Sequence, residues 1–155
     1  MNAVGWWILA LLLVVSYPKS AKFWSKNPLL QLLFAFSTLI PFIAGVLRLR
    51  LEHYTHDPYH GLFLLLYVFV LVWAADSGAY FSGRAFGKRK LAPKVSPGKS
   101  WEGVFGGLIT ALVLAFVFIH FSSDALVGER NISGFVILSV ATVAISVLGD
   151  LTESM

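Results

Sequence analysis

Two acidic residues near the end of the sequence have the spacing of a metal-binding pair. Asp150 and Glu153 lie three positions apart, so on a continuous helix both carboxylates project from one face. Proteins usually hold magnesium through one or two carboxylates together with phosphate oxygens of the substrate. The pair therefore predicts a magnesium site led by Asp150, whereas a plain polar helix end is the favoured alternative for Glu153.

The triplet Gly98-Lys99-Ser100 matches only the end of a phosphate-binding P-loop. That motif needs a glycine where Pro93 stands, and a preceding β-strand that this context does not favour. Ser96-Pro97 instead has the residue types of a helix N-cap and first helical position. A helix starting there would aim free amide groups at an anion, with Lys94 and Lys99 on either side. The segment predicts an anion site on a helix start, and a plain amphipathic turn stays open as the alternative.

Two further acids lie next to apolar runs. Asp76 comes near the end of one run, where a carboxylate is costly and is normally paired, metal-bound or in a wet cavity. An interfacial acid that reaches the headgroups is the alternative for Asp76. Small residues over 77–83 favour close helix packing at this level. Glu102 opens the next run, where the dipole of a helix N-terminus would stabilise it, just before the small-residue stripe Gly103-x-x-x-Gly107.

The elements that must position these residues are membrane helices. Of the 155 residues, 57% are hydrophobic and 13% are charged, whereas a soluble domain has about 25% charged residues. A helix that spans the bilayer needs about 20 apolar residues. The sequence therefore predicts an all-α, polytopic integral membrane protein with about five transmembrane helices and a single, partial domain. The expected helices are residues 3–17, 28–47, 61–81, 103–121 and 134–149, of which the first and last are short.

The basic residues are shared unequally among the four connecting loops. With five crossings, the first and third loops lie on one side of the membrane, and they hold nine basic residues against three in the other two. The positive-inside rule then places the basic loop 82–102 and the end of the last helix in the cytoplasm. The nine are Lys19, Lys22, Lys26, Arg84, Lys88, Arg89, Lys90, Lys94 and Lys99, and the three are Arg48, Arg50 and Arg130.

The second loop contains three histidines, His53, His56 and His60, together with Asp57. A metal site is one interpretation, but the spacing is loose and Pro58 interrupts any helix. Neutral imidazoles in an exposed loop are the favoured interpretation.

Five blocks of residues follow one another in a fixed order: Asp76-Ser77-Gly78-Ala79-Tyr80-Phe81, Phe86-Gly87-Lys88, Leu91 to Gly103, Gly106-Gly107 and Gly149 to Met155. Together these blocks resemble the bacterial phosphatidate cytidylyltransferases, also called CDP-diacylglycerol synthases. The resemblance implies a multi-pass inner-membrane enzyme that joins CTP and phosphatidic acid into CDP-diacylglycerol and pyrophosphate. It also implies a magnesium requirement and a homodimer, and no nucleic acid partner is expected.

The resemblance assigns roles to individual residues. Asp150 belongs to the metal centre, and Asp76 is the candidate for a supporting acid there. The expected mechanism is in-line nucleotidyl transfer, which depends on alignment and charge neutralisation. Lys94, Ser96, Lys99, Ser100 and Glu102 are the candidates that bind substrate, and Arg84 or Lys88 would steer anionic substrates.

Members of this family extend beyond both ends of the matching region, with more helices before it and a Lys-Arg, Lys-Asp and His-Gly-Gly signature after it. We therefore expect an interior fragment that is inactive alone. Two alternatives are an organic-anion transporter with Asp76 in its pathway and a non-catalytic membrane remnant. No internal repeat of the kind that transporters show is visible.

Overall fold

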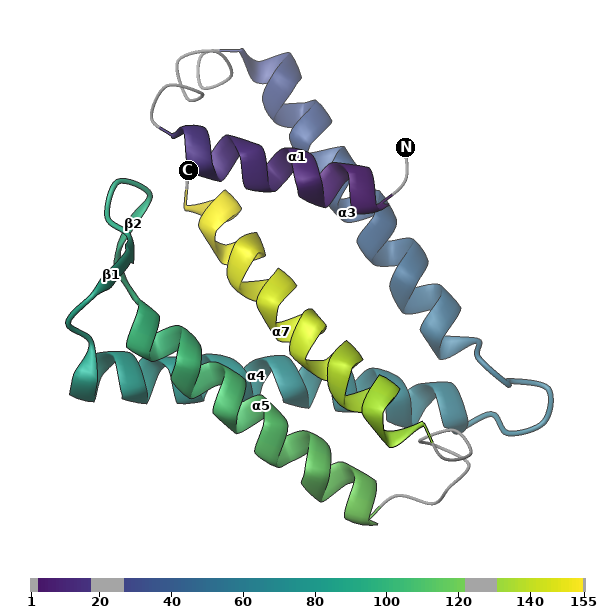
Figure 1. Cartoon of the computed structure of the whole chain (residues 1–155). Coiled ribbons are helices and arrows are strands. Elements are labelled where there is room, and N and C mark those ends of the chain that lie inside the picture. Colours follow the sequence, from purple (N-terminus) through teal and green to yellow (C-terminus); the bar gives the residue numbers. More distant parts are fainter. Residues whose placement is uncertain (1–2, 18–26, 122–130, 155) are drawn as a thin grey trace.

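The computed structural model describes residues 3–17, 27–121 and 131–154. Five helices cover most of this length, and a short β-hairpin joins two of them (Figure 1). Lys19, Lys22, Lys26, Arg130 and Met155 lie outside the described residues. The elements are α1 (Ala3–Ser16), α3 (Pro28–Arg50), α4 (His60–Phe86), β1 (Lys90–Ala92), β2 (Ser96–Ser100), α5 (Trp101–Phe121) and α7 (Ile132–Glu153).

The predicted all-α membrane fold is confirmed. Within the described residues, α3, α4, α5 and α7 are long and apolar enough to cross a bilayer, and α1 is a shorter apolar helix. Many large apolar side chains are exposed, and α3 has no buried residue at all. Such a surface is unfavourable in water and suits lipid, so the chain is a multi-pass membrane protein.

The end of α4 and the start of α5 differ from the prediction. The helix α4 continues past the apolar run to Phe86, which places Arg84 on a helix and not in a loop. The predicted helix start at Ser96-Pro97 is wrong, because Ser96–Ser100 forms a strand that pairs antiparallel with Lys90–Ala92. The expectation that no β-strand precedes this segment is also wrong, because Lys90–Ala92 forms one.

Local hydrogen bonds explain why α5 begins at Trp101. The Ser100 hydroxyl accepts the Gly103 amide at 3.2 Å, which caps the first turn. The Glu102 carboxylate accepts the Arg89 amide with both oxygens at 3.2 Å, and the Trp101 amide donates to the Arg89 carbonyl at 2.9 Å. These bonds hold the hairpin onto the helix start. The N-terminal cap of the helix is therefore Ser100 and not Ser96.

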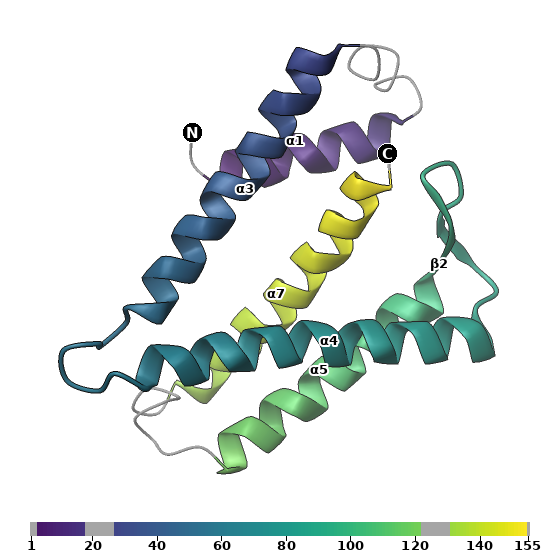
Figure 2. The same ribbon diagram turned by 180° about the vertical axis from the view of Figure 1, so that it is seen from behind.

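The helices α4 and α5 run side by side in both views (Figures 1 and 2) and make the most extensive helix contact among the described residues. A β-carbon added at Gly107 would lie 2.9 Å from the Ala75 carbonyl oxygen and 3.3 Å from the Ala79 side chain. One added at Gly106 would overlap the Ser82 side chain. The predicted small-residue packing is confirmed, since these glycines allow the two backbones to approach closely.

The helix α7 packs across this pair and completes the core. Tyr67 of α4 shares a buried hydrogen bond of 2.7 Å with Ser139 of α7, and its ring lies 4.3 Å from that of Phe118 on α5. Leu71 and Val143 are the largest fully buried side chains. As a result, α4, α5 and α7 form one packed unit. The hairpin and the C-terminal end of α7 lie at the same end of this unit (Figure 2).

Replacing Gly107 with alanine tests whether this close contact supports the fold. We expect Gly107→Ala to lower the free energy of unfolding by about 1–3 kcal/mol, because the Ala75 backbone must shift to admit the methyl group. Gly45→Ala on α3 is the control, since nothing lies within 4 Å of that position. Alanine is favoured over glycine in a helix, so the control should be neutral or slightly stabilising. Denaturant unfolding in detergent measures both, and equal effects would contradict the account.

Candidate active site

A cavity of about 640 Å³ opens where α4, α5, α7 and the hairpin meet. Its polar side chains come from elements far apart in the sequence. Around them the walls are glycines, alanines and valines, which leave room beside the charged groups. The polar residues are Asp76, Tyr80 and Arg84 of α4, Lys99 and Ser100 of β2, and Asp150 of α7.

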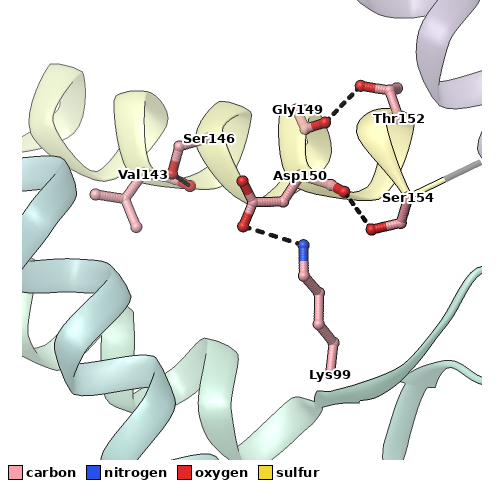
Figure 3. Close-up of polar contacts among 7 residues, drawn as sticks. All are labelled: Lys99, Val143, Ser146, Gly149, Asp150, Thr152 and Ser154. Atoms are coloured by element: carbon pink, nitrogen blue, oxygen red, sulfur yellow. Dashed lines mark hydrogen bonds and ion pairs between the residues drawn. The ribbon is translucent and has the colours of Figure 1, made fainter.

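Lys99 and Asp150, which both line the cavity, form an ion pair. The Lys99 Nζ lies 3.1 Å from Asp150 Oδ2, and the lysine side chain extends from the hairpin towards α7 (Figure 3). The two side chains are 26% and 53% exposed. Ion pairs that are partly exposed contribute little to stability. The pair therefore matters more for where it places a cation and a carboxylate than for holding the fold.

Asp76 faces the same cavity from α4 and interacts electrostatically with both Asp150 and Lys99. The structure thus brings two carboxylates together from different helices. Two carboxylates plus phosphate oxygens suit magnesium, so the residues present fit that ion. Across the described part of the chain, no cluster of three acidic or histidine side chains forms a metal site. Glu153 is exposed on α7 and does not line the cavity.

Only some of the residues predicted to bind substrate reach the cavity. Lys99, Ser100 and Arg84 line it. Lys88, Lys94, Ser96 and Glu102 do not line it: Lys88 and Lys94 are exposed, Ser96 pairs with Ala92 in the hairpin, and Glu102 binds the Arg89 amide. These four residues lie outside the cavity, and their part in substrate binding stays a prediction.

Tyr80 lines the cavity, although the sequence predicts no role for it. Its hydroxyl accepts a hydrogen bond of 2.8 Å from Arg84 Nη1. The two residues are four positions apart, which is the spacing at which helical side chains meet, and this signal was present in the sequence. Tyr80 therefore orients the Arg84 guanidinium at the rim of the cavity.

The second loop lies outside the site. The His53 and His60 rings contact each other at 5.0 Å, and Arg50 Nη1 donates to the Pro58 carbonyl at 3.0 Å. These contacts close the turn between α3 and α4, at the end of α4 that is far from Arg84.

Comparison with known proteins shows which family this chain resembles in sequence. The model of the "Cytidylyltransferase family" matches residues 1–155. The chain is 91% identical to a phosphatidate cytidylyltransferase of Haemophilus influenzae over 155 residues, which are 100% of the chain and 54% of the relative. It is 43% identical over 154 residues to the Pseudomonas aeruginosa protein of that name, covering 99% of the chain and 53% of the relative.

A phosphatidate cytidylyltransferase of Bacillus subtilis is 45% identical over 98 residues, which are 61% of the chain and 34% of that relative. No solved structure matches. The chain spans about half the length of the first two relatives. The resemblance inferred from the ordered motifs is confirmed, and the chain belongs to the cytidylyltransferase family.

Proposed function

We propose that this chain forms part of a phosphatidate cytidylyltransferase, which transfers the cytidylyl group of CTP to phosphatidic acid and releases pyrophosphate. The 91% identity to a relative of that name supports the activity. The observation that carries the proposal is the meeting of Lys99, Asp150 and Asp76 at one cavity. These three side chains combine a cation that can bind phosphates with two carboxylates that can bind a metal. They lie towards the end of helices that contact lipid.

The chemistry asks for alignment and charge neutralisation more than for a base. A phosphate monoester loses its second proton with a pKa near 6, so the attacking lipid oxygen is already ionised at neutral pH. That oxygen forms a bond to the α-phosphorus of CTP while the bond to pyrophosphate breaks. We assign the binding of phosphate oxygens to Lys99 and Arg84, which both line the cavity. Tyr80 supports this assignment, because its hydroxyl accepts a hydrogen bond from Arg84.

Magnesium is the cofactor we propose, with Asp150 and Asp76 as the residues that would hold it. The bound ion would neutralise charge on the phosphates. Asp150 already lies at hydrogen-bonding distance from one cation, which supports its role as a ligand for another. Asp76 completes the pair from the opposite helix.

We also propose that the hairpin and the end of α7 face the cytoplasm of a bacterial inner membrane. The excess of basic residues in the first and third loops supports this orientation. CTP would then approach from the side on which the cavity lies. The homodimer stays a prediction from the family resemblance.

The transporter alternative has no structural observation in its favour. Its pathway would need polar groups along the helices. The charged residues of α4 and α7 that line the cavity all lie towards one end of the helices, from Asp76 to Arg84 and at Asp150.

Asp150→Asn tests the metal role. The variant is best made in a chimaera in which this chain replaces the matching region of the Haemophilus influenzae relative. We expect conversion of labelled CTP and phosphatidic acid to fall by about 100-fold or more, because the carboxylate charge at the metal is lost. Glu153→Gln is the matched control on the same helix and should retain most of the activity, since Glu153 lies outside the cavity. Near-normal activity of Asp150→Asn would exclude the metal role.

Lys99→Ala tests nucleotide binding in the same chimaera. Loss of a charge-assisted contact should raise KM for CTP by about 10- to 100-fold, with a smaller effect on kcat. Lys94→Ala is the control, because it removes the same charge from the exposed turn of the same hairpin. Steady-state kinetics at varied CTP measures both. An unchanged KM for Lys99→Ala, or an equal change for Lys94→Ala, would remove Lys99 from the nucleotide site.

A further inference from the structure

The Lys99 ammonium group has donors that are not in use. Its Nζ is shielded from solvent, and within the described residues it makes no hydrogen bond of good geometry beyond its ion pair with Asp150. An ammonium group can donate three hydrogen bonds. Leaving such a group with unfilled donors costs free energy, which a further acceptor would recover. The cavity beside it is large enough to admit that acceptor.

Asp150 is the carboxylate that a divalent cation would use, and Lys99 already neutralises it. The Nζ lies 3.1 Å from Asp150 Oδ2, whereas magnesium binds oxygen at about 2.0–2.1 Å. A divalent ion at that oxygen would lie close to the ammonium group. Repulsion between two positive charges at such a distance is strong when water is partly excluded. The metal and Lys99 therefore compete for Asp150.

The Lys99 side chain can move to another anion when it loses its contact with Asp150. Lys99 is carried by a strand of a two-stranded hairpin, and its side chain extends from that strand to Asp150 on α7 (Figure 3). The long, flexible stem lets the ammonium group turn towards another anion in the cavity. A phosphate oxygen would take up the donors that Asp150 leaves unfilled.

We propose that Lys99 is an internal counterion, which holds Asp150 while no metal is bound and moves to a substrate phosphate when a divalent cation binds. The identity of the phosphate in this proposal rests on the proposed function. The competition between Lys99 and the metal for Asp150 does not rest on it. One consequence is that metal and nucleotide favour each other's binding, by the same factor in both directions. Asp150 is then paired with a cation in the empty state of the site as well as in the metal-bound state.

Metal binding alone tests the competition. The probe is Mn²⁺, titrated into the metal-free chimaera without nucleotide or lipid, with free Mn²⁺ counted by electron paramagnetic resonance. We expect Lys99→Met to bind Mn²⁺ about two- to fivefold more tightly than the unchanged protein. Lys90→Met is the matched control, because it removes the same charge from the exposed neighbouring strand. An unchanged or weaker affinity for Lys99→Met, or an equal gain for Lys90→Met, would overturn the proposal.

Amine labelling of the unchanged chimaera tests the movement and needs no variant. Lys99 should react slowly with acetic anhydride when metal is absent and faster, relative to Lys90, when Mg²⁺ is added. Mass spectrometry of the labelled peptides gives the ratio. A ratio that Mg²⁺ does not raise would contradict the movement. Neither measurement involves turnover. If the chimaera transfers the cytidylyl group but shows none of these metal effects, the counterion role is wrong and the proposed function stands. If the chimaera shows the metal effects but no cytidylyl transfer, the proposed function is wrong and the counterion role stands.

Discussion

The close approach of α4 and α5 is the constraint on which the rest of the structure depends. Gly106 and Gly107 let the two backbones approach so closely that a β-carbon would strike the facing helix. The two helices are therefore held together at the level of Asp76, and the short hairpin is their only connection there. Because the short hairpin is attached to both helices, Lys99 stays near the end of the helix pair. Packing that looks purely structural thus decides where the charges lie.

The polar end of the bundle then follows from the cost of charge near lipid. A carboxylate at the end of a membrane helix needs a partner or a wet cavity. Asp76 and Asp150 line the same cavity, and both interact electrostatically with Lys99. Lys99 supplies the balancing charge from an element that is not a membrane helix. The same arrangement that makes these acids tolerable at the membrane surface also makes them available to a cation and to phosphates.

The sequence was enough to predict the membrane helices, the small-residue contact and the family, because each depends on a local or ordered pattern. It was not enough for the hairpin. Ser96-Pro97 has the local signature of a helix start. Only the pairing with Lys90–Ala92 and the hydrogen bond that the Arg89 amide donates to the Glu102 carboxylate reveal the strand. Spacing along one helix groups Asp150 with Glu153, whereas in the structure Asp150 forms an ion pair with Lys99. That contact joins segments far apart in the sequence, so spacing along one helix cannot predict it.

The central claim is that the hairpin brings Lys99 to Asp150, and thiol cross-linking tests it most directly. The chain has no cysteine, so Lys99→Cys with Asp150→Cys would introduce the only two thiols. A short bifunctional methanethiosulfonate reagent, applied to the chain in membranes, should join this pair within one molecule. It should leave Lys90→Cys with Asp150→Cys unjoined. Equal cross-linking of both pairs, or none of the first, would contradict the placement of the hairpin over α7.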